Sequence, residues 1–274
     1  MTSDEPIVVF RDVTTRFDET WALNNISVSL GPGETRIILG AAGSGKTTLL
    51  KSVIGLVPVD SGSIRLFDEE VTAMTDHALF PVRAKAGFLF QEGGLFDSLT
   101  IGENVEYPLA NQQARARVSP EESERRVRDA LRFVELEHTI DKFPSEVSGG
   151  MRRRVGIARA IVTEPPLVLY DSPTAGLDPI TANTIMTVVA KERDVRNSAS
   201  FIVTHRYQDG ELMVKFRYDP ETEELVPVPE DEQNDPDRTR TKFMVMREGR
   251  IVFLGTKLEL ETSSDPYLLR FCRH

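Results

Sequence analysis

The chain has 274 residues, of which 40% are hydrophobic and 28% charged, so it can bury a sizeable core in one large α/β unit. Its net charge of −10 argues against a general nucleic-acid binder. Cys272 is the single cysteine, which excludes an internal disulfide and is compatible with a reducing compartment. Residues 1–6 are acidic and polar, unlike a signal peptide, and no apolar run approaches the ~18 residues of a membrane span. If the protein works at a membrane, another protein must carry it there.

Strands and helices are predicted to alternate along most of the chain. Apolar runs predict strands at residues 7–13, 26–30, 37–39, 63–67, 87–90, 167–170 and 199–204. Helical spacing and start signals predict helices at residues 47–54, 75–85, 121–136, 148–162 and 179–192. Residues 243–247 and 251–254 are predicted to form a hairpin through Glu248-Gly249. This alternation predicts one parallel sheet, covered on both faces, which binds its ligands at the carboxyl ends of the strands.

Residues 40–47 read G-A-A-G-S-G-K-T and match the phosphate-binding pattern G-x-x-x-x-G-K-[ST]. The stretch lies between a predicted strand and a predicted helix, as this loop requires. Its glycines allow backbone N–H groups to surround phosphate oxygens, and the helix N-terminus adds its positive dipole end. Lys46 can then reach the β- and γ-phosphates, and the Thr47 hydroxyl can bind Mg²⁺. The alternative, a glycine-rich turn that only caps the helix, explains neither the context nor the spacing.

Two later segments fit the same nucleotide site. Asp171 ends the buried run 167–170, so it is expected at a strand tip where it can hold the Mg²⁺ shell, although an Asp there can also cap a turn. Ser148-Gly149-Gly150 opens a predicted helix and makes a second anion cradle. A chain with one nucleotide site and no internal repeat rarely needs two cradles. We therefore expect a two-fold symmetric dimer in which each second cradle completes the site of the partner.

These motifs together resemble those of the ATP-binding cassette (ABC) ATPases, and the resemblance covers nearly the whole chain. The matches, in chain order, are the Walker A motif at residues 40–47, the Q-loop glutamine Gln91, the signature motif Ser148-Gly149-Gly150, the Walker B aspartate Asp171, the D-loop at residues 175–178 and the switch histidine His205. Phe17 lies 23 residues before Gly40, where the family places an aromatic that stacks on adenine, and Trp21 is a competing aromatic. Taken singly, several of these residues fit ordinary structural roles, but their order and spacing favour the family together.

The resemblance implies a fold, a set of domains and a set of site residues. The fold is an α/β P-loop NTPase core with a parallel sheet, an N-terminal antiparallel β subdomain and an inserted helical subdomain at about residues 98–160. The ATP-binding domain would cover residues 5–255, with an acidic insertion at about 215–240 and a tail at 256–274. ATP would be bound by Phe17, Gly40, Ala41, Ala42, Gly43, Ser44, Gly45, Lys46, Thr47, Thr48, Ser148, Gly149, Gly150 and Asp178. Mg²⁺ would be held by Thr47, Gln91 and Asp171, and the reaction would be served by Ser172, His205, Gln91 and Lys46.

The resemblance also implies partners and a location. A homodimer of the chain would sit under an integral-membrane permease dimer, peripheral to the cytoplasmic face of the inner membrane, with no nucleic acid involved. Residues 90–109, 149–155 and Tyr170-Asp171 look like those of the Mla/Mce-type lipid transporters, in which a Mce-domain partner binds lipid. Amino-acid importers, including methionine importers, and cell-division complexes have similar stretches and remain alternatives. Translation or DNA-repair cassette proteins usually carry two fused cassettes or a coiled-coil insertion, and neither is visible here.

Position 172 departs from the family pattern, which usually has glutamate directly after the Walker B aspartate. Ser172 stands there instead, and a serine hydroxyl is a poor proton acceptor near neutral pH. Losing a positioned base typically costs roughly 10²–10⁴-fold in rate. Three hypotheses follow: a slow ATPase, a base supplied by Glu92 or by the partner chain, or an ATP-dependent switch that does not hydrolyse. The alternative to all three is that Ser172 orients the water well enough, because most of the catalysis is electrostatic. Of these possibilities, we favour real but slow turnover.

The second departure is an acidic stretch at residues 219–237, which holds nine acidic residues and no Lys or Arg. It contributes most of the net charge of −10. A solvated loop is one reading, and pairing of residues 214–218 with 225–228 as an added hairpin is another. A third reading is a docking surface for a regulatory partner or a basic permease loop, in which case deletion of residues 230–237 should weaken complex assembly.

Overall fold

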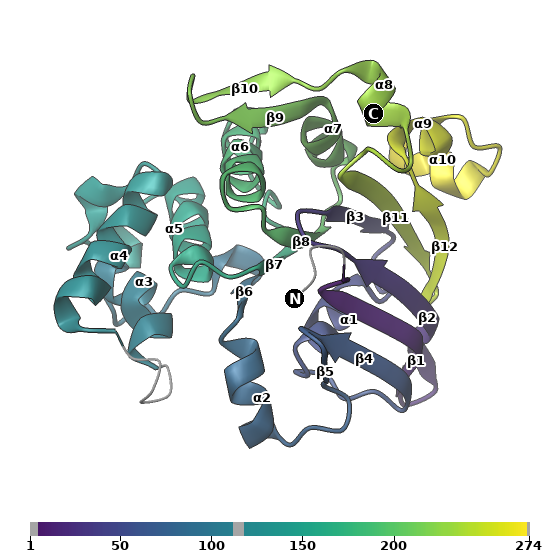
Figure 1. Ribbon diagram of the computed structural model, residues 1–274, viewed down its shortest axis with the longest axis horizontal. Coiled ribbons are helices and arrows are strands. Elements are labelled where there is room, and N and C mark those ends of the chain that lie inside the picture. Colours follow the sequence, from purple (N-terminus) through teal and green to yellow (C-terminus); the bar gives the residue numbers. More distant parts are fainter. Residues whose placement is uncertain (1–4, 112–117, 273–274) are drawn as a thin grey trace.

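The computed structural model describes residues 5–111 and 118–272, and its centre is a six-stranded sheet (Figure 1). The strand order is β12-β11-β3-β8-β7-β6, and all neighbours are parallel except the β11–β12 pair. The strands are β3 (Thr35–Gly40), β6 (Ala86–Leu89), β7 (Leu167–Asp171), β8 (Ala199–Val203), β11 (Thr241–Arg247) and β12 (Arg250–Gly255). The predicted parallel sheet and the predicted hairpin through Glu248-Gly249 are both confirmed.

Alternate residues of the central strands face two separate hydrophobic cores, as the two-residue period of a strand requires. On β3, Ile37 and Leu39 belong to one core and Ile38 to the other. The first core is shared with the helices α5 (Gly149–Ile161), α6 (Pro179–Arg196) and α7 (Tyr207–Lys215). The second is shared with α1 (Lys46–Val53), α2 (Asp76–Arg83) and the N-terminal strands. The near-continuous apolar runs in the sequence therefore reflect strands that are buried on both faces.

A second, antiparallel sheet covers the α1 side of the molecule. Its order is β2-β1-β4-β5, formed by β1 (Val8–Phe17), β2 (Thr20–Leu30), β4 (Ser61–Leu66) and β5 (Glu69–Glu70). The first two strands are longer than predicted, because β1 extends to Phe17 and β2 begins at Thr20, so that Arg16 pairs with Trp21. The sequence prediction stopped at Val13 because the next residues, Thr14 to Arg16, are polar, although Thr15 is buried. This extension brings two aromatic side chains, Phe17 and Trp21, to the tip of the hairpin.

Three helices form a group beside the sheet, on the left in Figure 1: α3 (Ile101–Ala110), α4 (Pro120–Phe133) and α5. The predicted start of α4 is confirmed, since the Ser119 hydroxyl accepts a hydrogen bond from the Glu122 amide and Pro120 occupies the first turn. Helix α3 was not predicted. Its start is fixed by a capping box between Thr100 and Glu103, while Pro108 near its end weakens the helical signal. Single 3₁₀ turns lie at Gln91–Gly93, Glu137–Thr139 and Pro144–Glu146.

The acidic stretch is folded and is not a solvated loop. Strands β9 (Phe216–Asp219) and β10 (Glu224–Pro227) pair in antiparallel fashion, so the predicted extra hairpin is confirmed, and the short helix α8 (Glu230–Asn234) follows. Glu232 and Asp231 form ion pairs with Arg217 and Arg238 at 2.9 and 2.7 Å. These basic residues lie just outside the acidic run, which is why the run alone suggested an unpartnered segment.

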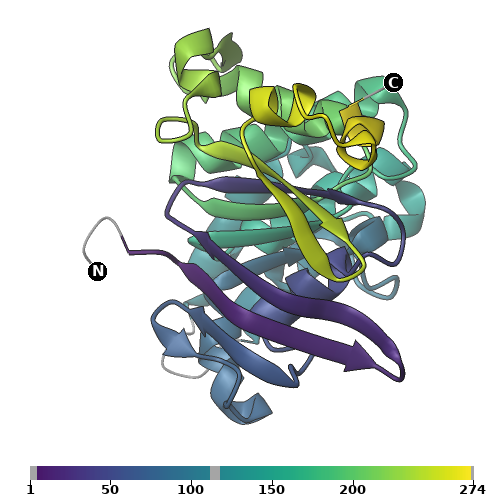
Figure 2. The same cartoon turned by 90° about the vertical axis from the view of Figure 1, so that its right-hand side faces the viewer.

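The C-terminal residues return to the edge of the central sheet. Helices α9 (Lys257–Glu261) and α10 (Pro266–Cys272), drawn in yellow in Figure 2, lie close to the β11–β12 hairpin. Tyr207 on α7 anchors α9 by donating a hydrogen bond to Glu261 Oε1 over 2.8 Å. Among the described residues, no helix combines the length and the apolar character needed to cross a membrane.

Candidate nucleotide-binding site

The loop between β3 and α1 wraps around the side chain of Lys46. Its ammonium Nζ donates hydrogen bonds to the carbonyl oxygens of Gly40 and Ala41, both over 2.8 Å, and lies 3.4 Å from Ser44 Oγ. Burial lowers the pKa of Lys46, while the negative charge of Asp171 acts in the opposite direction. The charged nitrogen is therefore held inside the concave side of the loop, where it can meet an anion.

Backbone conformation explains the glycine at position 45. Gly45 has a φ of 99° and immediately precedes α1, and a Cβ at this position would collide with the carbonyl oxygen of Ala22 on β2. The neighbouring Ser44 carbonyl accepts a hydrogen bond from the amide of Gly249 over 3.2 Å. The loop is thus held between β2 and the turn of the β11–β12 hairpin, and no other residue type fits position 45 without rearrangement.

A cleft of about 380 Å³ opens over this loop and gathers residues from segments far apart in the sequence. Ala42 to Thr48 form its floor, and Phe17, Thr20, Trp21 and Ala22 of the N-terminal hairpin form one wall. The other residues lie at or just after the carboxyl ends of β6, β7 and β8: Gln91, Ser172, Ala175, Val203 and His205. The predicted meeting of loop, strand ends and an aromatic residue is therefore observed within a single chain.

Both candidate aromatic platforms lie on the cleft wall. The side chain of Phe17 is 51% exposed and that of Trp21 44% exposed, so each is open to a planar ligand. The guanidinium of Arg16 lies 5.1 Å from the centre of the Trp21 ring. This cation–π contact holds one face of Trp21, whereas no ring or cation contact is recorded for Phe17 among the described residues.

The carboxylate of Asp171 lies behind the cleft at the end of β7, with only 4% of the residue exposed. The hydroxyl of Ser172 donates a hydrogen bond to its Oδ1 over 3.2 Å. Ser172 itself has a left-handed φ of 55°, held by a bond from its amide to Val203 O at 2.9 Å and a bond from Arg153 Nη1 to its carbonyl at 2.8 Å. The turn after β7 is therefore tied both to β8 and to α5.

The His205 imidazole reaches the same cleft from the end of β8. Partial desolvation lowers its pKa and the nearby Lys46 ammonium lowers it further, while Asp171 acts in the opposite direction. The neutral imidazole is therefore favoured near neutral pH. In that form one ring nitrogen can accept a hydrogen bond while the other donates one.

The residues that line the described cleft include no aspartate or glutamate. The hypothesis that Glu92 supplies a base concerns a side chain outside the described part of the structure. The donors near Asp171 nevertheless suit Mg²⁺, which prefers oxygen ligands and usually takes one or two carboxylates together with substrate phosphates. Thr47 and Gln91, which carry a hydroxyl and an amide oxygen, both line the cleft.

Six predicted ATP-binding residues do not line this cleft: Gly40 and Ala41 at the start of the phosphate-binding loop, and Ser148, Gly149, Gly150 and Asp178. Ser148 caps α5 by accepting a hydrogen bond from the Met151 amide, and Asp178 caps α6 by accepting bonds from the Ile180 and Thr181 amides. Ser148, Gly149 and Asp178 are exposed. A role for these residues in nucleotide binding thus requires a second chain to approach.

One contact to the phosphate-binding loop had no signal in the sequence. The hydroxyl of Tyr267 on α10 donates a hydrogen bond to Met246 O over 2.9 Å and accepts one from the Ala41 amide over 3.4 Å. The two partners lie on β11 and at the start of the loop. Because 226 residues separate Tyr267 from Ala41, no local pattern could have revealed the pair.

Comparisons with known proteins agree with this geometry. The family model described as ABC transporter matches residues 23–175. The methionine import ATP-binding protein MetN of Brucella abortus (strain 2308) is 36% identical over 73% of this chain, and the chain spans about half of that protein (53%). The sulfate/thiosulfate import ATP-binding protein CysA of Nitrosomonas europaea is 32% identical over 97% of this chain and 66% of its own length.

Two solved structures have similar folds. The dimeric, post-hydrolysis ATP-binding cassette MJ0796, bound to ADP and Pi, superposes with a TM-score of 0.75 at 28% identity, covering 91% of this chain and 98% of the other. The cbiO1 protein of Clostridium perfringens, described as part of the ABC transporter complex cbiONQ, has a TM-score of 0.74 at 25% identity, covering 97% and 94%. The cassette fold expected from the motifs is thereby confirmed.

Proposed function

Because this chain belongs to the ABC transporter family, we propose that it is an ATP-binding subunit that couples ATP hydrolysis to the work of a separate permease. The observation that carries the proposal is the single cleft in which Lys46, Gln91 and His205 meet the aromatic residues Phe17 and Trp21. Each group comes from a different element. Their convergence suits a ligand with a planar base at one end and phosphates at the other.

Each part of the cleft has a role in the proposed reaction. Backbone amides of the loop and the Lys46 ammonium stabilise the phosphate charge, which grows on the γ-phosphoryl oxygens as water attacks. Gln91 and neutral His205 can orient that water or contact the γ-phosphate by hydrogen bonds. A Mg²⁺ ion held by Thr47, Asp171 and Gln91 would supply charge neutralisation at the phosphates. With Ser172 in place of a carboxylate, proton removal from water is weakly assisted, so we propose slow turnover.

We propose that two copies of the chain form the complete site. The exposed positions of Ser148, Gly149 and Asp178, outside the cleft, support this arrangement. In a two-fold dimer, the α5 N-terminus of one copy would cover the loop of the other and present N–H groups to the γ-phosphate. The dimeric state of the similar cassette MJ0796 is consistent with this proposal.

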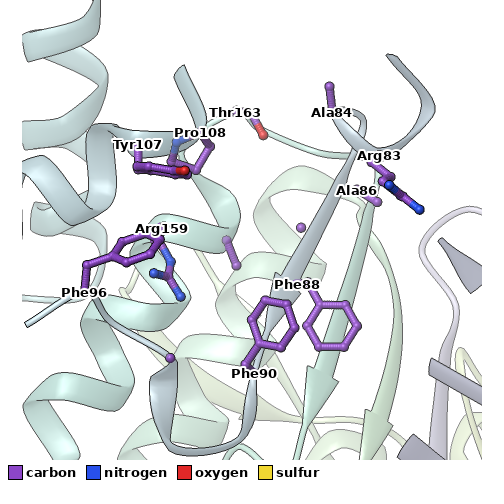
Figure 3. A pocket seen from close by; sticks show the side chains of 13 residues that line it. Arg83, Ala84, Ala86, Phe88, Phe90, Phe96, Tyr107, Pro108, Arg159 and Thr163 are labelled. Atoms are coloured by element: carbon purple, nitrogen blue, oxygen red, sulfur yellow. The ribbon is translucent and has the colours of Figure 1, made fainter. Parts of the chain in front are cut away.

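A groove between the sheet and the helical group is the proposed contact with the permease, which would place the chain at the cytoplasmic face of the membrane. The groove is lined by aromatic side chains at the edge of β6 and on the following segment (Figure 3). Phe88 and Phe90 stack with ring centres 4.3 Å apart, and Phe96 and Tyr107 lie 4.8 Å apart. Exposed apolar surface of this kind marks an interaction site.

The walls of this groove are held in place from within the chain. Asn104 is fully buried and forms four hydrogen bonds to residues 96–100, so the loop that carries Phe96 is fixed to α3. Arg159 donates to Gly93 O over 2.8 Å and lies 5.8 Å from the Phe96 ring centre. A docked segment would meet a preformed surface, which lowers the entropic cost of binding.

For the cargo, the relatives favour a small polar solute over a lipid. The similar proteins named above import methionine and sulfate or thiosulfate. This supports the alternative of an amino-acid importer of the methionine type. The lipid-transport reading, with its Mce-domain partner, rests only on the pattern of residues 90–109, 149–155 and 170–171, and we rank it second.

The decisive experiment is to purify the native complex, identify its subunits and its bound solute, and measure phosphate release. A polytopic membrane protein with an amino-acid-binding subunit would support the importer proposal. A lipid-bound Mce-domain subunit would support the lipid reading instead. A complex without any membrane subunit would refute the transport proposal. A complex that binds ATP without releasing phosphate would instead support a regulatory subunit that does not hydrolyse ATP.

A further inference from the structure

A buried carboxylate on α7 joins the two loops that carry Ser172 and His205. Asp209 is only 1% exposed, and its Oδ2 accepts hydrogen bonds from the hydroxyls of Thr174 and Thr204, both over 2.5 Å. Thr174 lies two residues after Ser172, in the turn that follows β7. Thr204 directly precedes His205 at the end of β8. Asp209 Oδ2 thus links the two loops that carry the cleft residues Ser172 and His205.

The surrounding contacts fix the geometry of this junction. The Thr204 hydroxyl, whose proton is directed at Asp209, accepts a hydrogen bond from the Arg206 amide over 3.0 Å. Arg206 Nε also lies 3.8 Å from Asp209 Oδ1, a long ion pair without a hydrogen bond. Both threonines are 1% exposed, so water does not compete for their hydroxyls. The loop that begins at Thr204 is therefore held on both sides of His205.

Burying the Asp209 carboxylate costs free energy that an apolar side chain filling the same space would not cost. Burial raises the pKa of Asp209, against the opposing effects of the two hydroxyls and of Arg206. Its Oδ1 has no hydrogen-bond partner among the described residues. A whole buried ion pair can often be replaced by apolar residues of similar volume with no loss of stability. A buried carboxylate that accepts hydrogen bonds from hydroxyls on two separate loops therefore points to a role in geometry.

We propose that Asp209 is a positioning residue for ATP hydrolysis, which holds the Ser172 loop and the His205 loop in fixed register. The inference rests on the proposed function, because it assigns Asp209 a part in that reaction. Asp209 does not line the cleft and acts only through Thr174 and Thr204. Its loss should therefore slow turnover while leaving ATP affinity, which depends on the phosphate-binding loop, unchanged.

The test compares three variants of the full chain in single-turnover phosphate release and in ATP binding. Asp209→Ala removes the shared acceptor and should slow release by roughly 10- to 100-fold, the scale of a small misplacement of reacting groups. Asp209→Asn keeps one oxygen acceptor and should retain most of the rate. Ser200→Ala is the control, since Ser200 lies at the start of β8, away from the loops, and the change removes a buried hydroxyl contact with Thr35 on β3; it should leave the rate unchanged.

Hydrogen–deuterium exchange of the nucleotide-free variants supplies a readout that does not depend on turnover. Asp209→Ala should increase exchange at residues 172–176 and 204–206 together, and Asp209→Asn should not. Wild-type turnover in Asp209→Ala, equal damage in both variants, or unchanged exchange in either loop would overturn the inference. A wild-type chain that releases no phosphate would refute the proposed function, and the exchange result would then decide whether Asp209 joins the loops.

Discussion

The hydroxyl of Ser172 donates its hydrogen bond to Oδ1 of Asp171, so the side chain at the position of the usual base faces the proposed metal ligand. The cleft is therefore left without a basic carboxylate at this position. A glutamate at this position would add one at the same backbone site, which is fixed by the bonds to Val203 O and from Arg153.

We expect Ser172→Glu to raise the rate of ATP hydrolysis by about tenfold or more, because a positioned base typically contributes 10²–10⁴-fold. Phosphate release from the purified complex measures the effect. Ser172→Gln is the control, since it has the same length without a basic carboxylate and should leave the rate low. No increase with glutamate, or an equal increase with glutamine, would count against the missing-base explanation.

The two aromatic residues of the cleft wall can be separated by their effect on ATP affinity. Stacking of a base on an aromatic side chain is worth about 1–3 kcal/mol, so Phe17→Ala should weaken ATP binding by roughly 5- to 150-fold if Phe17 is the platform. Trp21→Ala should then have a smaller effect. Trp21 is the only tryptophan of the chain, so its fluorescence reports binding directly in wild type and in Phe17→Ala. A larger loss of affinity in Trp21→Ala would assign the platform to Trp21.

Glu192 on α6 should make the free energy of unfolding depend on pH. The residue is fully buried, and Arg196 Nη1 lies 3.3 Å from its Oε2. Burial raises the pKa of Glu192 from 4.5 to about 7, against the opposing charge of Arg196. Between these two pKa values the folded protein keeps a proton on Glu192 that the unfolded chain has released. The free energy of unfolding is therefore highest below pH 4.5 and decreases as the pH rises through about 7.

We accordingly expect Glu192→Gln to be more stable than wild type at pH 8, on the order of 1–3 kcal/mol, and to show a flatter stability profile between pH 4.5 and 7. Urea unfolding at a series of pH values measures both quantities. Replacement of the exposed Glu230 by Gln is the matched control and should leave the profile unchanged. Parallel profiles for wild type and Glu192→Gln would show that the pKa of Glu192 is the same in the folded and unfolded chain, which would contradict the prediction.

The aromatic groove can be tested without knowing the permease in advance. Tyr107 on α3 is 44% exposed, and Tyr107→Asp should abolish co-purification with the membrane subunits while ATP binding is retained, because a charge replaces apolar contact area. Val252→Asp changes a similarly exposed apolar residue on β12, far from the groove in sequence, and serves as the control. Intact complexes with Tyr107→Asp would exclude this groove as the docking surface.

Features that depend on local pattern were predictable from the sequence, and features that depend on distant contacts were not. The strand ends that place Asp171 and His205 in the site follow from apolar runs, and the loop around Lys46 follows from its glycine spacing. Helix α3 was missed because it is short and contains Pro108. The supports from Tyr267 and Asp209 join elements that only the fold brings together, so their residues look ordinary in the sequence.

The location of Ser148 outside the cleft of its own chain has a consequence for mixtures of variants. In the proposed dimer, a chain defective at Lys46 and a chain defective at Ser148 would each fail alone, since both sites of either homodimer are damaged. Combined, they form heterodimers in which one site collects both defects and the other is intact. Two inactive alleles of this chain should therefore complement each other when they are expressed in one cell, to the extent that a single working site supports the cycle.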